Sequence, residues 1–242
     1  MAYAGKSRRG FTLIELLVVV SIISLLVSML LPTLGQARRH SRKVLCLTRL
    51  GGQVRALYMY AGANRGRLPA GPSEPMDPPM PPLPYDSIAT NQLWIGKLAV
   101  YNGCGALVGS EWQNENGFFC PDDDSSDPQE ELEKLRGRGG EDAYGSYLYR
   151  QFDQAESARM GDLGTNDAGL AAKALLMDLN SLMPGLPERT NHRGELVNIG
   201  FVDGHAKTFE NTSARFTLRP EDIANPFARL DEILQEADRM AQ

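Results

Sequence analysis

One acidic side chain, Glu15, lies within the most apolar stretch of the chain. Residues 11–31 carry no other charge, and a carboxylate inside a membrane-spanning segment costs roughly 2.5 to 3.5 kcal/mol. A cation is therefore expected beside it. Cleavage between Gly10 and Phe11 would create an α-amino group that can neutralise Glu15 on a neighbouring helix. The alternative is that Glu15, about one turn into the segment, lies at the membrane interface.

A second group that could do chemistry surrounds a strand-turn-strand pattern. His192 and His205 flank this pattern, and both could meet Asp203 at one end of it in a catalytic or metal-binding group. The alternative is that Asp203 forms the turn and the histidines serve its hydrogen bonding. The motifs of nucleotide hydrolases, α/β-hydrolases and common zinc proteins do not occur, so no catalytic residue is assigned.

An acidic segment begins at Asp122 and has the density of carboxylates that suits calcium. If it is a twelve-residue loop, Asp124 is at position three and Glu133 at position twelve. Position six is Asp127, where such a loop has glycine, so the pattern is broken. The alternative is a solvated acidic loop that leads into a helix. Calcium at these residues is the one cofactor considered, and no other metal is expected.

The three cysteines leave one unpaired whatever the pairing. In an exported head, Cys104 and Cys120 could close a 17-residue loop with a disulfide that stabilises the fold by about 3 kcal/mol. Cys46 would then be free and buried between helices. The alternative is that all three are reduced cysteines in the core.

The elements that position Glu15 are helical. Residues 11–31 form an apolar run of 21 residues, which as a helix spans roughly 31 Å, about the thickness of a bilayer core. A cleaved secretory signal is the alternative, because Lys6, Arg8 and Arg9 make a positive flank. The run is longer than the apolar region of such signals, and no A-x-A-like site follows it. These features favour a retained transmembrane helix.

The sequence from Arg9 to Val19, RGFTLIELLVV, resembles the class III signal of type IV prepilins and type II secretion pseudopilins. The resemblance implies that a prepilin peptidase removes the leader, residues 1–10, by cutting after Gly10, and then methylates the amine of Phe11. It also implies that Glu15 registers each incoming subunit against the amine of its neighbour. Pro32 lies where many members of the family have a proline that bends the helix.

The same resemblance supplies partners and location. The partners are prepilin peptidase, identical or related pseudopilin subunits, an inner-membrane assembly platform and the membrane itself. Three positive charges in the leader and four in residues 38–43 leave the orientation undecided, so it is taken from the resemblance. The chain would cross the inner membrane once, with its head outside the cytoplasm, and then enter an extracytoplasmic filament.

Charge is divided unevenly along the rest of the chain. Residues 16–73 hold no acid and carry a charge of +8, whereas residues 74–242 carry −15. The basic part includes an amphipathic stem helix at 32–67, which we expect to pack against acidic heads, and no nucleic acid is expected as a partner. Residues 68–87 include eight of the fifteen prolines and are predicted to be an extended loop between stem and head.

Residues 88–242 are predicted to form a globular α+β head with an antiparallel sheet, as in pilins. Its predicted elements are helices at 91–101 and 127–136, strands at 146–152 and 174–179, a hairpin at 196–202 and 205–210, and a C-terminal helix at 227–240. Asp203-Gly204 is expected to form a tight type I′ turn in the hairpin.

The head also resembles a bacterial pseudopilin-like family known for its H-x9-DG signature. The residues that carry this resemblance are Cys46, Leu50, Tyr60, Gly66, Leu68-Pro69, Cys120-Pro121-Asp122-Asp123, Gly145-Ser146-Tyr147, Asn191-His192-Arg193-Gly194, Asn198, Phe201 and Asp203-Gly204-His205. Ten residues separate His192 from Asp203 instead of nine, and no glycine pair follows His192. The resemblance therefore implies architecture rather than activity.

Together these patterns predict a structural filament subunit of a type II secretion or type IV pilus-type system, and not an enzyme. The alternative is a membrane-anchored envelope protein, either a binding protein or an enzyme, that uses the same helix without polymerising.

Overall fold

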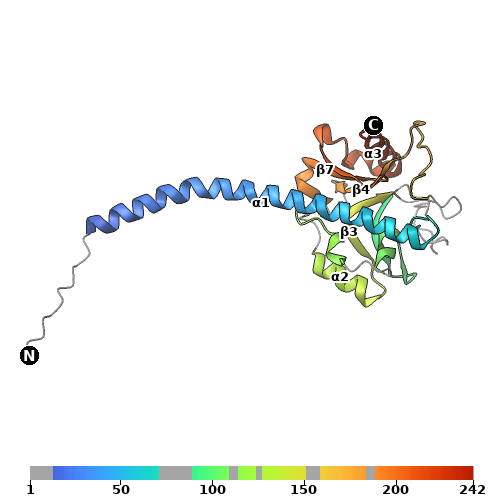
Figure 1. The fold of residues 1–242 in the computed structure, drawn as a ribbon, viewed down its shortest axis with the longest axis horizontal. Helices are drawn as coiled ribbons and strands as arrows, with labels where there is room; N and C mark the ends of the chain where they lie inside the picture. The colour runs from blue at the N-terminus through green and yellow to red at the C-terminus, as the bar shows by residue number, and fades with distance from the viewer. Residues whose placement is uncertain are drawn as a thin grey trace, which may run out of the picture. The chain divides into compact units, whose positions relative to one another are not determined.

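The computed structural model describes residues 13–70, 89–108, 114–123, 127–150, 159–183 and 189–241. The chain divides into two compact units, Met1–Ser41 and Arg42–Gln242, and the boundary falls inside one helix. This helix, α1, extends over 51 residues from Leu13 to Ala63 (Figure 1). Each unit is therefore described separately.

The second unit is built on a six-stranded antiparallel sheet in the order β2-β1-β3-β4-β7-β8. Its strands are β1 (Ala89–Ile95), β2 (Val100–Tyr101), β3 (Ala143–Arg150), β4 (Ala174–Asp178), β7 (Leu196–Phe201) and β8 (Ala206–Glu210). A two-stranded ribbon pairs β5 (Asn180–Ser181) with β6 (Arg189–Thr190). The helices of this unit besides α1 are α2 (Pro128–Gly137), α3 (Pro226–Arg239) and the short 3-10 helices η1 (Gly103–Leu107), η2 (Glu115–Phe118), η3 (Asn191–Gly194), η4 (Thr212–Ala214) and η5 (Pro220–Ala224). The predicted α+β class is confirmed.

Helices α1 and α3 pack on opposite faces of the sheet. Successive side chains of a strand point to opposite faces. In β3, Tyr147 and Tyr149 join the apolar cluster that contains α1, whereas Leu148 between them joins the cluster that contains α3. The sheet is therefore covered on both sides, which explains why six of the eight residues of β3 are buried in succession.

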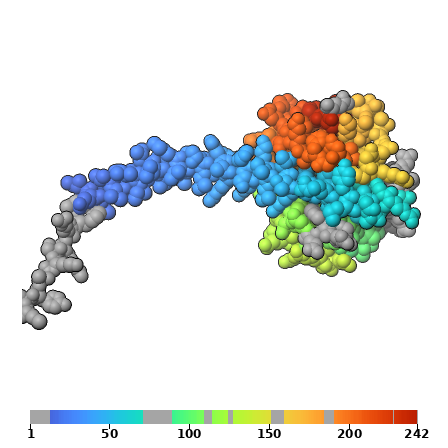
Figure 2. Space-filling view, viewed as in Figure 1, coloured from blue at the N-terminus to red at the C-terminus, as the bar shows by residue number. Residues whose placement is uncertain are grey.

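The part of α1 that belongs to the second unit is held by one apolar stripe. Cys46, Leu50, Val54 and Leu57 recur at helical spacing and are all fully buried. Gly200 of β7 permits this close packing, because a Cβ atom there would lie 2.6 Å from both Leu50 and Val54. Figure 2 shows this part of α1, in cyan, between the green segment with α2 and the orange segment with β7 and β8.

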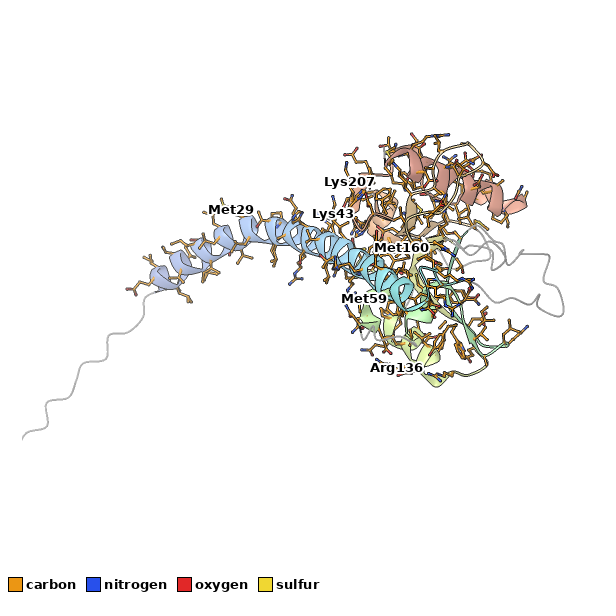
Figure 3. The ribbon with its side chains drawn as sticks, turned by 45° about the vertical axis from the view of Figure 1, so that its right-hand side comes forward. Met29, Lys43, Met59, Arg136, Met160 and Lys207 are labelled. Carbon is orange, nitrogen blue, oxygen red and sulfur yellow. The ribbon has the colours of Figure 1, made fainter. Side chains whose placement is uncertain are left out.

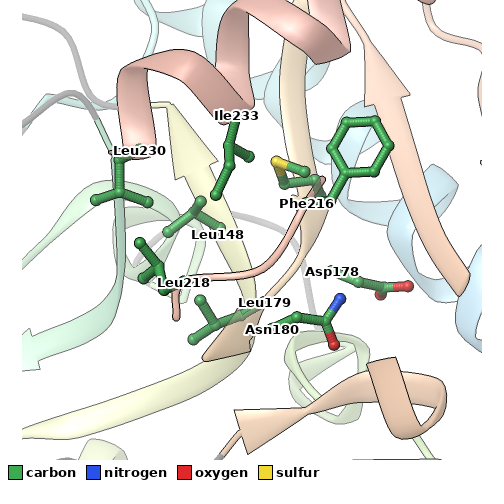
Figure 4. A pocket seen from close by; sticks show the side chains of 9 residues that line it. Leu148, Asp178, Leu179, Asn180, Phe216, Leu218, Leu230 and Ile233 are labelled. Atoms are coloured by element: carbon green, nitrogen blue, oxygen red, sulfur yellow. The ribbon is translucent and has the colours of Figure 1, made fainter. Parts of the chain in front are cut away.

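Helix α3 is fastened to the other face by an ion pair as well as by apolar side chains. Arg150 of β3 donates two hydrogen bonds to Asp238, at 3.0 and 2.8 Å, and both side chains are buried. Burial alone would raise the pKa of the Asp238 carboxyl, but the Arg150 guanidinium lowers it. Leu148, Leu218, Leu230 and Ile233 line a small pocket at this interface (Figure 4). These apolar side chains indicate packing rather than ligand binding.

Several predicted elements of the head are confirmed. The strands expected at 146–152 and 174–179 correspond to β3 and β4, and the hairpin corresponds to β7 and β8. The helix expected at 127–136 is α2, which begins as predicted with an Asp-Pro start: the Asp127 side chain accepts a hydrogen bond from the amide of Gln129 at 2.9 Å. The C-terminal helix is α3.

The helix predicted at 91–101 is wrong. This segment forms strand β1, a turn and strand β2. Gly96 is the first residue of the turn. The chain there passes so close to Gly140 that a Cβ atom at Gly96 would lie 2.2 Å from the Gly140 carbonyl carbon, so only glycine fits. Ala99 in the same turn adopts φ +51°. β1 pairs with β3, and this pairing determines the structure of the segment although the apolar residues of β1 have helical spacing.

The type I′ turn predicted at Asp203-Gly204 in the hairpin is also wrong in its type. A type I′ turn needs positive φ at both central residues. Of residues 202–205, which connect β7 to β8, only Gly204 has a positive φ, at +93°. The Asp203 side chain accepts a hydrogen bond from the amide of His205 at 3.1 Å, which stabilises the longer connection. Most of the Pro-rich segment predicted at 68–87 lies outside the described residues.

Candidate functional site

The first candidate region is the N-terminal part of α1, residues 13–41. Every side chain in it is exposed, including large apolar ones such as Leu13, Leu25 and Leu30. By length and composition α1 is able to span a membrane. Figure 3 shows side chains of this part, with Met29 labelled, projecting outward around the helix. An apolar surface of this extent is stable against lipid tails or other apolar helices, but not against water.

The serine side chains in the apolar part of α1 form hydrogen bonds within the helix. Ser21, Ser24 and Ser28 donate hydrogen bonds of 2.7 to 2.8 Å to backbone carbonyls three or four residues before them. Glu15 lies in the first turn and is exposed. The helix continues through Pro32, and the bend expected there stays a prediction. Gly10 and Phe11 lie outside the described residues.

The second candidate region is a buried polar cluster formed by Cys46, Cys120, Asp178 and His192. Cys46 comes from α1, Cys120 precedes α2, Asp178 ends β4, and His192 lies in η3. Each is at most 4% exposed. Figure 4 shows the carboxylate of Asp178 pointing away from the apolar side chains that line the pocket beneath α3. Four segments distant in sequence, one of them α1, thus meet at one buried place.

The donor and acceptor atoms of the buried polar cluster converge. Cys46 Sγ lies 3.3 Å from Asp178 Oδ1, and Cys120 Sγ lies 3.6 Å from His192 Nε2. His192 Nε2 is 3.5 Å from Asp178 Oδ2. One ligand atom from each of the four residues lies within 4.8 Å of all the others. Thiol, imidazole and carboxylate groups are the ligands that zinc uses in proteins.

Surrounding groups hold the cluster residues in place. Asp178 accepts hydrogen bonds from the amide of Asn198 at 2.8 Å and the side chain of Asn191 at 3.3 Å. His192 has φ +52°, and its Nδ1 lies 3.3 Å from Asp122 Oδ2. The side chain of Asn198 lies 3.1 Å from His192 Nε2. The imidazole is therefore fixed between a carboxylate on one side and the cluster on the other.

The electrostatics of the cluster favour a positive charge at its centre. Burial raises the pKa of the Asp178 carboxyl and of the Cys46 thiol. For Cys120, burial opposes ionisation, but hydrogen bonds from Cys46 and His192 lower the pKa of the thiol. For His192, burial opposes the charge, yet the hydrogen bond with Cys120 and the charge of Asp178 raise the pKa to about 9.

The predicted disulfide between Cys104 and Cys120 is not formed. All three cysteines are free and buried. The side chain of Cys120 is directed to His192, and Cys104 lies in η1, where burial raises the pKa of its thiol. Cys46 is free and buried as expected, although it packs against the sheet of the head and not between helices.

The predicted meeting of His192 and His205 at Asp203 is half right. His205 Nδ1 hydrogen-bonds to Asp203, and both side chains are exposed at the end of the hairpin. His192 is instead buried in the cluster beneath α1. Its left-handed backbone turns the side chain inward from η3, which the sequence pattern around the hairpin does not indicate.

The acidic residues considered for calcium are placed differently from a twelve-residue loop. The Asp122 carboxylate faces Arg42 at 3.2 Å and His192 at 3.3 Å. Glu133 is an exposed residue of α2, which begins at Pro128 and so interrupts such a loop. Asp124 lies outside the described residues. The expected calcium site has no support from the two residues that are described.

A family model for the prokaryotic N-terminal methylation motif matches residues 5–31. The chain carries this methylation motif. It is typical of the prepilin-type signal of type IV pilins and pseudopilins, and it ends within the apolar first part of α1. Neither curated proteins nor solved structures give a match to the chain.

The methylation motif contains the residues that the sequence indicates for processing. Gly10, Phe11 and Glu15 all lie between residues 5 and 31, and Glu15 is in the first turn of the apolar helix α1. The signal therefore marks a pilin-like substrate of prepilin peptidase. The individual roles of cleavage, methylation and registry at these residues stay predictions.

Sequence reasoning missed the buried polar cluster. Its ligand-type residues are separated by at least 14 positions, so no short metal motif marks them. Asp178 was the least visible, although it directly follows the apolar residues ALLM within β4, which is an unusual place for an acid. Cys46 carried a comparable signal, because it lies on the apolar side of the stem.

Proposed function

We propose that this protein is a structural subunit of a pilin-like filament of a type II secretion or type IV pilus-type system. The observation that carries the proposal is the methylation motif at residues 5–31 on a continuous helix whose residues 13–41 are all exposed. Lipid covers this apolar surface before assembly, and neighbouring helices cover it in the filament. The same surface thus serves as a membrane anchor and then as a filament core.

In this mechanism the leader is removed by prepilin peptidase between Gly10 and Phe11, and the new amine is methylated. The subunit rests in the inner membrane with its head outside the cytoplasm until an assembly platform extracts it. Glu15 of the incoming subunit and the Phe11 amine of its neighbour then neutralise each other in an apolar surrounding, where an unpaired charge is costly. Related subunits are the other partners in the fibre.

The head acts as a structural module in this proposal. Among the described residues, the group of His, Cys and Asp side chains that converges within 4.8 Å is buried, and the exposed pair of Asp203 and His205 belongs to a turn. This arrangement favours a structural subunit over an enzyme.

The first experiment determines the N-terminus and intact mass of the protein recovered from membranes. We expect a chain that begins at N-methylated Phe11. An intact Met1, or a chain that starts beyond Pro32, would contradict the proposed processing.

The second experiment separates assembly from anchoring. We expect Glu15→Ala to be inserted and cleaved normally but to be lost from the sheared, detergent-free filament fraction, because the neighbouring amine has no partner. Glu133→Ala, the same substitution at an exposed glutamate of α2, is the control and should assemble like the unmodified protein. Normal assembly of Glu15→Ala would refute the registry role. Processed protein that stays entirely in membranes would indicate an anchored protein that does not polymerise.

A further inference from the structure

We propose that Cys46, Cys120, Asp178 and His192 form a structural zinc site that fastens α1 to the head. The proposal concerns the second unit alone and does not depend on polymerisation. It begins from the convergence of four ligand-type residues on one buried point, with one ligand atom of each within 4.8 Å of the others.

Three of the separations between these residues are close to the edges of a tetrahedral zinc site. Zinc binds thiolate at about 2.3 Å and imidazole or carboxylate at about 2.0 to 2.2 Å, so the ligand atoms of one tetrahedron lie about 3.3 to 3.8 Å apart. The observed distances are 3.3 Å from Cys46 Sγ to Asp178 Oδ1, 3.6 Å from Cys120 Sγ to His192 Nε2 and 3.5 Å from His192 Nε2 to Asp178 Oδ2. The two distances to Asp178 involve different carboxylate oxygens, and one ligand atom of each residue lies within 4.8 Å of all the others, so an ion at the centre would draw these atoms closer together.

The groups around the cluster are those that orient metal ligands. A metal-bound histidine usually donates its second N–H to a carboxylate, which fixes the ring. His192 Nδ1 faces Asp122 Oδ2 at 3.3 Å, and Nε2 faces the centre of the cluster. The amide of Asn198 and the side chain of Asn191 hold the Asp178 carboxylate, while Tyr147 contacts Cys46 Sγ at 3.3 Å.

The chemistry of the ligand set favours zinc among the divalent cations. Two thiolates select a soft or borderline metal, which excludes calcium and magnesium as the occupants. All four residues are buried, so the site lacks the open position that a catalytic zinc keeps for water or substrate. A closed site of this kind is structural.

The position of the site gives it a mechanical role. Cys46 provides the first buried side chain of α1, and the other three ligands come from the head. An ion would join α1 to the segment between η2 and α2, to the end of β4 and to η3. These four segments meet where α1 packs against the sheet. Loss of the ion would weaken the junction between α1 and the head.

The test measures metal in the full-length protein, purified in detergent with a tag that contains no histidine. We expect about one zinc per chain by mass spectrometry of the elements, both in the unmodified protein and in Cys104→Ala. Cys104 is a matched control because it is equally free and buried but lies in η1, outside the cluster. Cys120→Ala should lose the zinc. Equal zinc in Cys120→Ala and Cys104→Ala would overturn the proposal.

A measurement on the unmodified protein covers the case in which Cys120→Ala does not fold. Cobalt added to the folded, reduced and metal-free chain should give the thiolate-to-cobalt band in the near ultraviolet and the visible bands of a tetrahedral complex, saturating at one equivalent. Zinc should displace it. Folded, reduced protein that binds neither metal would overturn the proposal.

A mass lower by two hydrogens, with Cys46 and Cys120 joined in one non-reduced peptide, would also overturn it in favour of a disulfide. These readouts come from purified protein, so they stand apart from the filament assay. Failure of the zinc site leaves the proposed assembly role open, and failure of assembly leaves the zinc site open.

Discussion

Helix α1 is one continuous element, but its two parts differ in the burial of their side chains. In residues 13–41 every side chain is exposed, although most are apolar. In residues 42–63 eight residues are buried, beginning with Cys46. The second part has a sheet opposite it, whereas the first part has no such partner within the described chain. Apolar side chains thus stabilise the head in one part, while in the other they are available for lipid or for other subunits.

The largest effect that tests this comparison is expected from a matched pair of leucines. Leu50 is fully buried, and Leu25 is 58% exposed. Leu50→Ala removes packing against β7 and leaves a cavity, so we expect it to lower the free energy of unfolding of the head by about 2 to 5 kcal/mol. Leu25→Ala should change it by less than about 0.5 kcal/mol.

Chemical denaturation of the full chain in detergent, followed by the fluorescence of the tryptophans, is the measurement. Trp94 is a suitable reporter because it is buried in the same apolar cluster as Leu50. Equal effects of the two leucine substitutions would show that α1 does not divide in the way described.

A pair of glycines sharpens the comparison with a smaller expected effect. A Cβ atom at Gly200 would lie 2.6 Å from Leu50 and Val54, whereas Gly35 has nothing within 4 Å. Gly200→Ala must displace both side chains, so we expect a loss of about 1 to 3 kcal/mol.

Gly35→Ala relieves the low helix propensity of glycine without a clash, so it should leave the head unchanged and favour the helix. The same denaturation experiment and the helical signal in circular dichroism separate the two outcomes. Unchanged stability of Gly200→Ala would contradict the close packing of α1 on β7.

The sequence predicted those elements whose structure is determined by residues close to them in the chain. The apolar run at 11–31, the Asp-Pro start of α2 and the strands of the hairpin depend on neighbours in sequence, and each corresponds to an element of the structure. The amphipathic character predicted for the stem at 32–67 is confirmed in part: Leu50, Val54 and Leu57 are buried, whereas Val44 and Leu45 are 49% and 43% exposed.

The features that could not be predicted depend on partners far away in sequence. Segment 91–101 is a strand pair because β3 lies beside it, although its apolar residues have helical spacing. The buried polar cluster joins residues 46 and 192, and the sequence around neither residue indicates that the two are in contact. Asp178 reaches it only because the pleat of β4 directs its side chain toward α1 while Met177 faces α3.

The smallest effect is expected from the ion pair at the point where the two parts of α1 adjoin. Arg42 Nη1 lies 3.2 Å from Asp122, but the arginine side chain is 56% exposed and its charge is screened by water. We expect Arg42→Ala to lower the free energy of unfolding by less than about 1 kcal/mol, and the difference should shrink in high salt. Arg38→Ala, in the exposed part, is the matched control and should have no effect on the head. A larger loss that is insensitive to salt would mean that the basic stem holds the acidic head by charge, and that the apolar stripe of α1 is secondary.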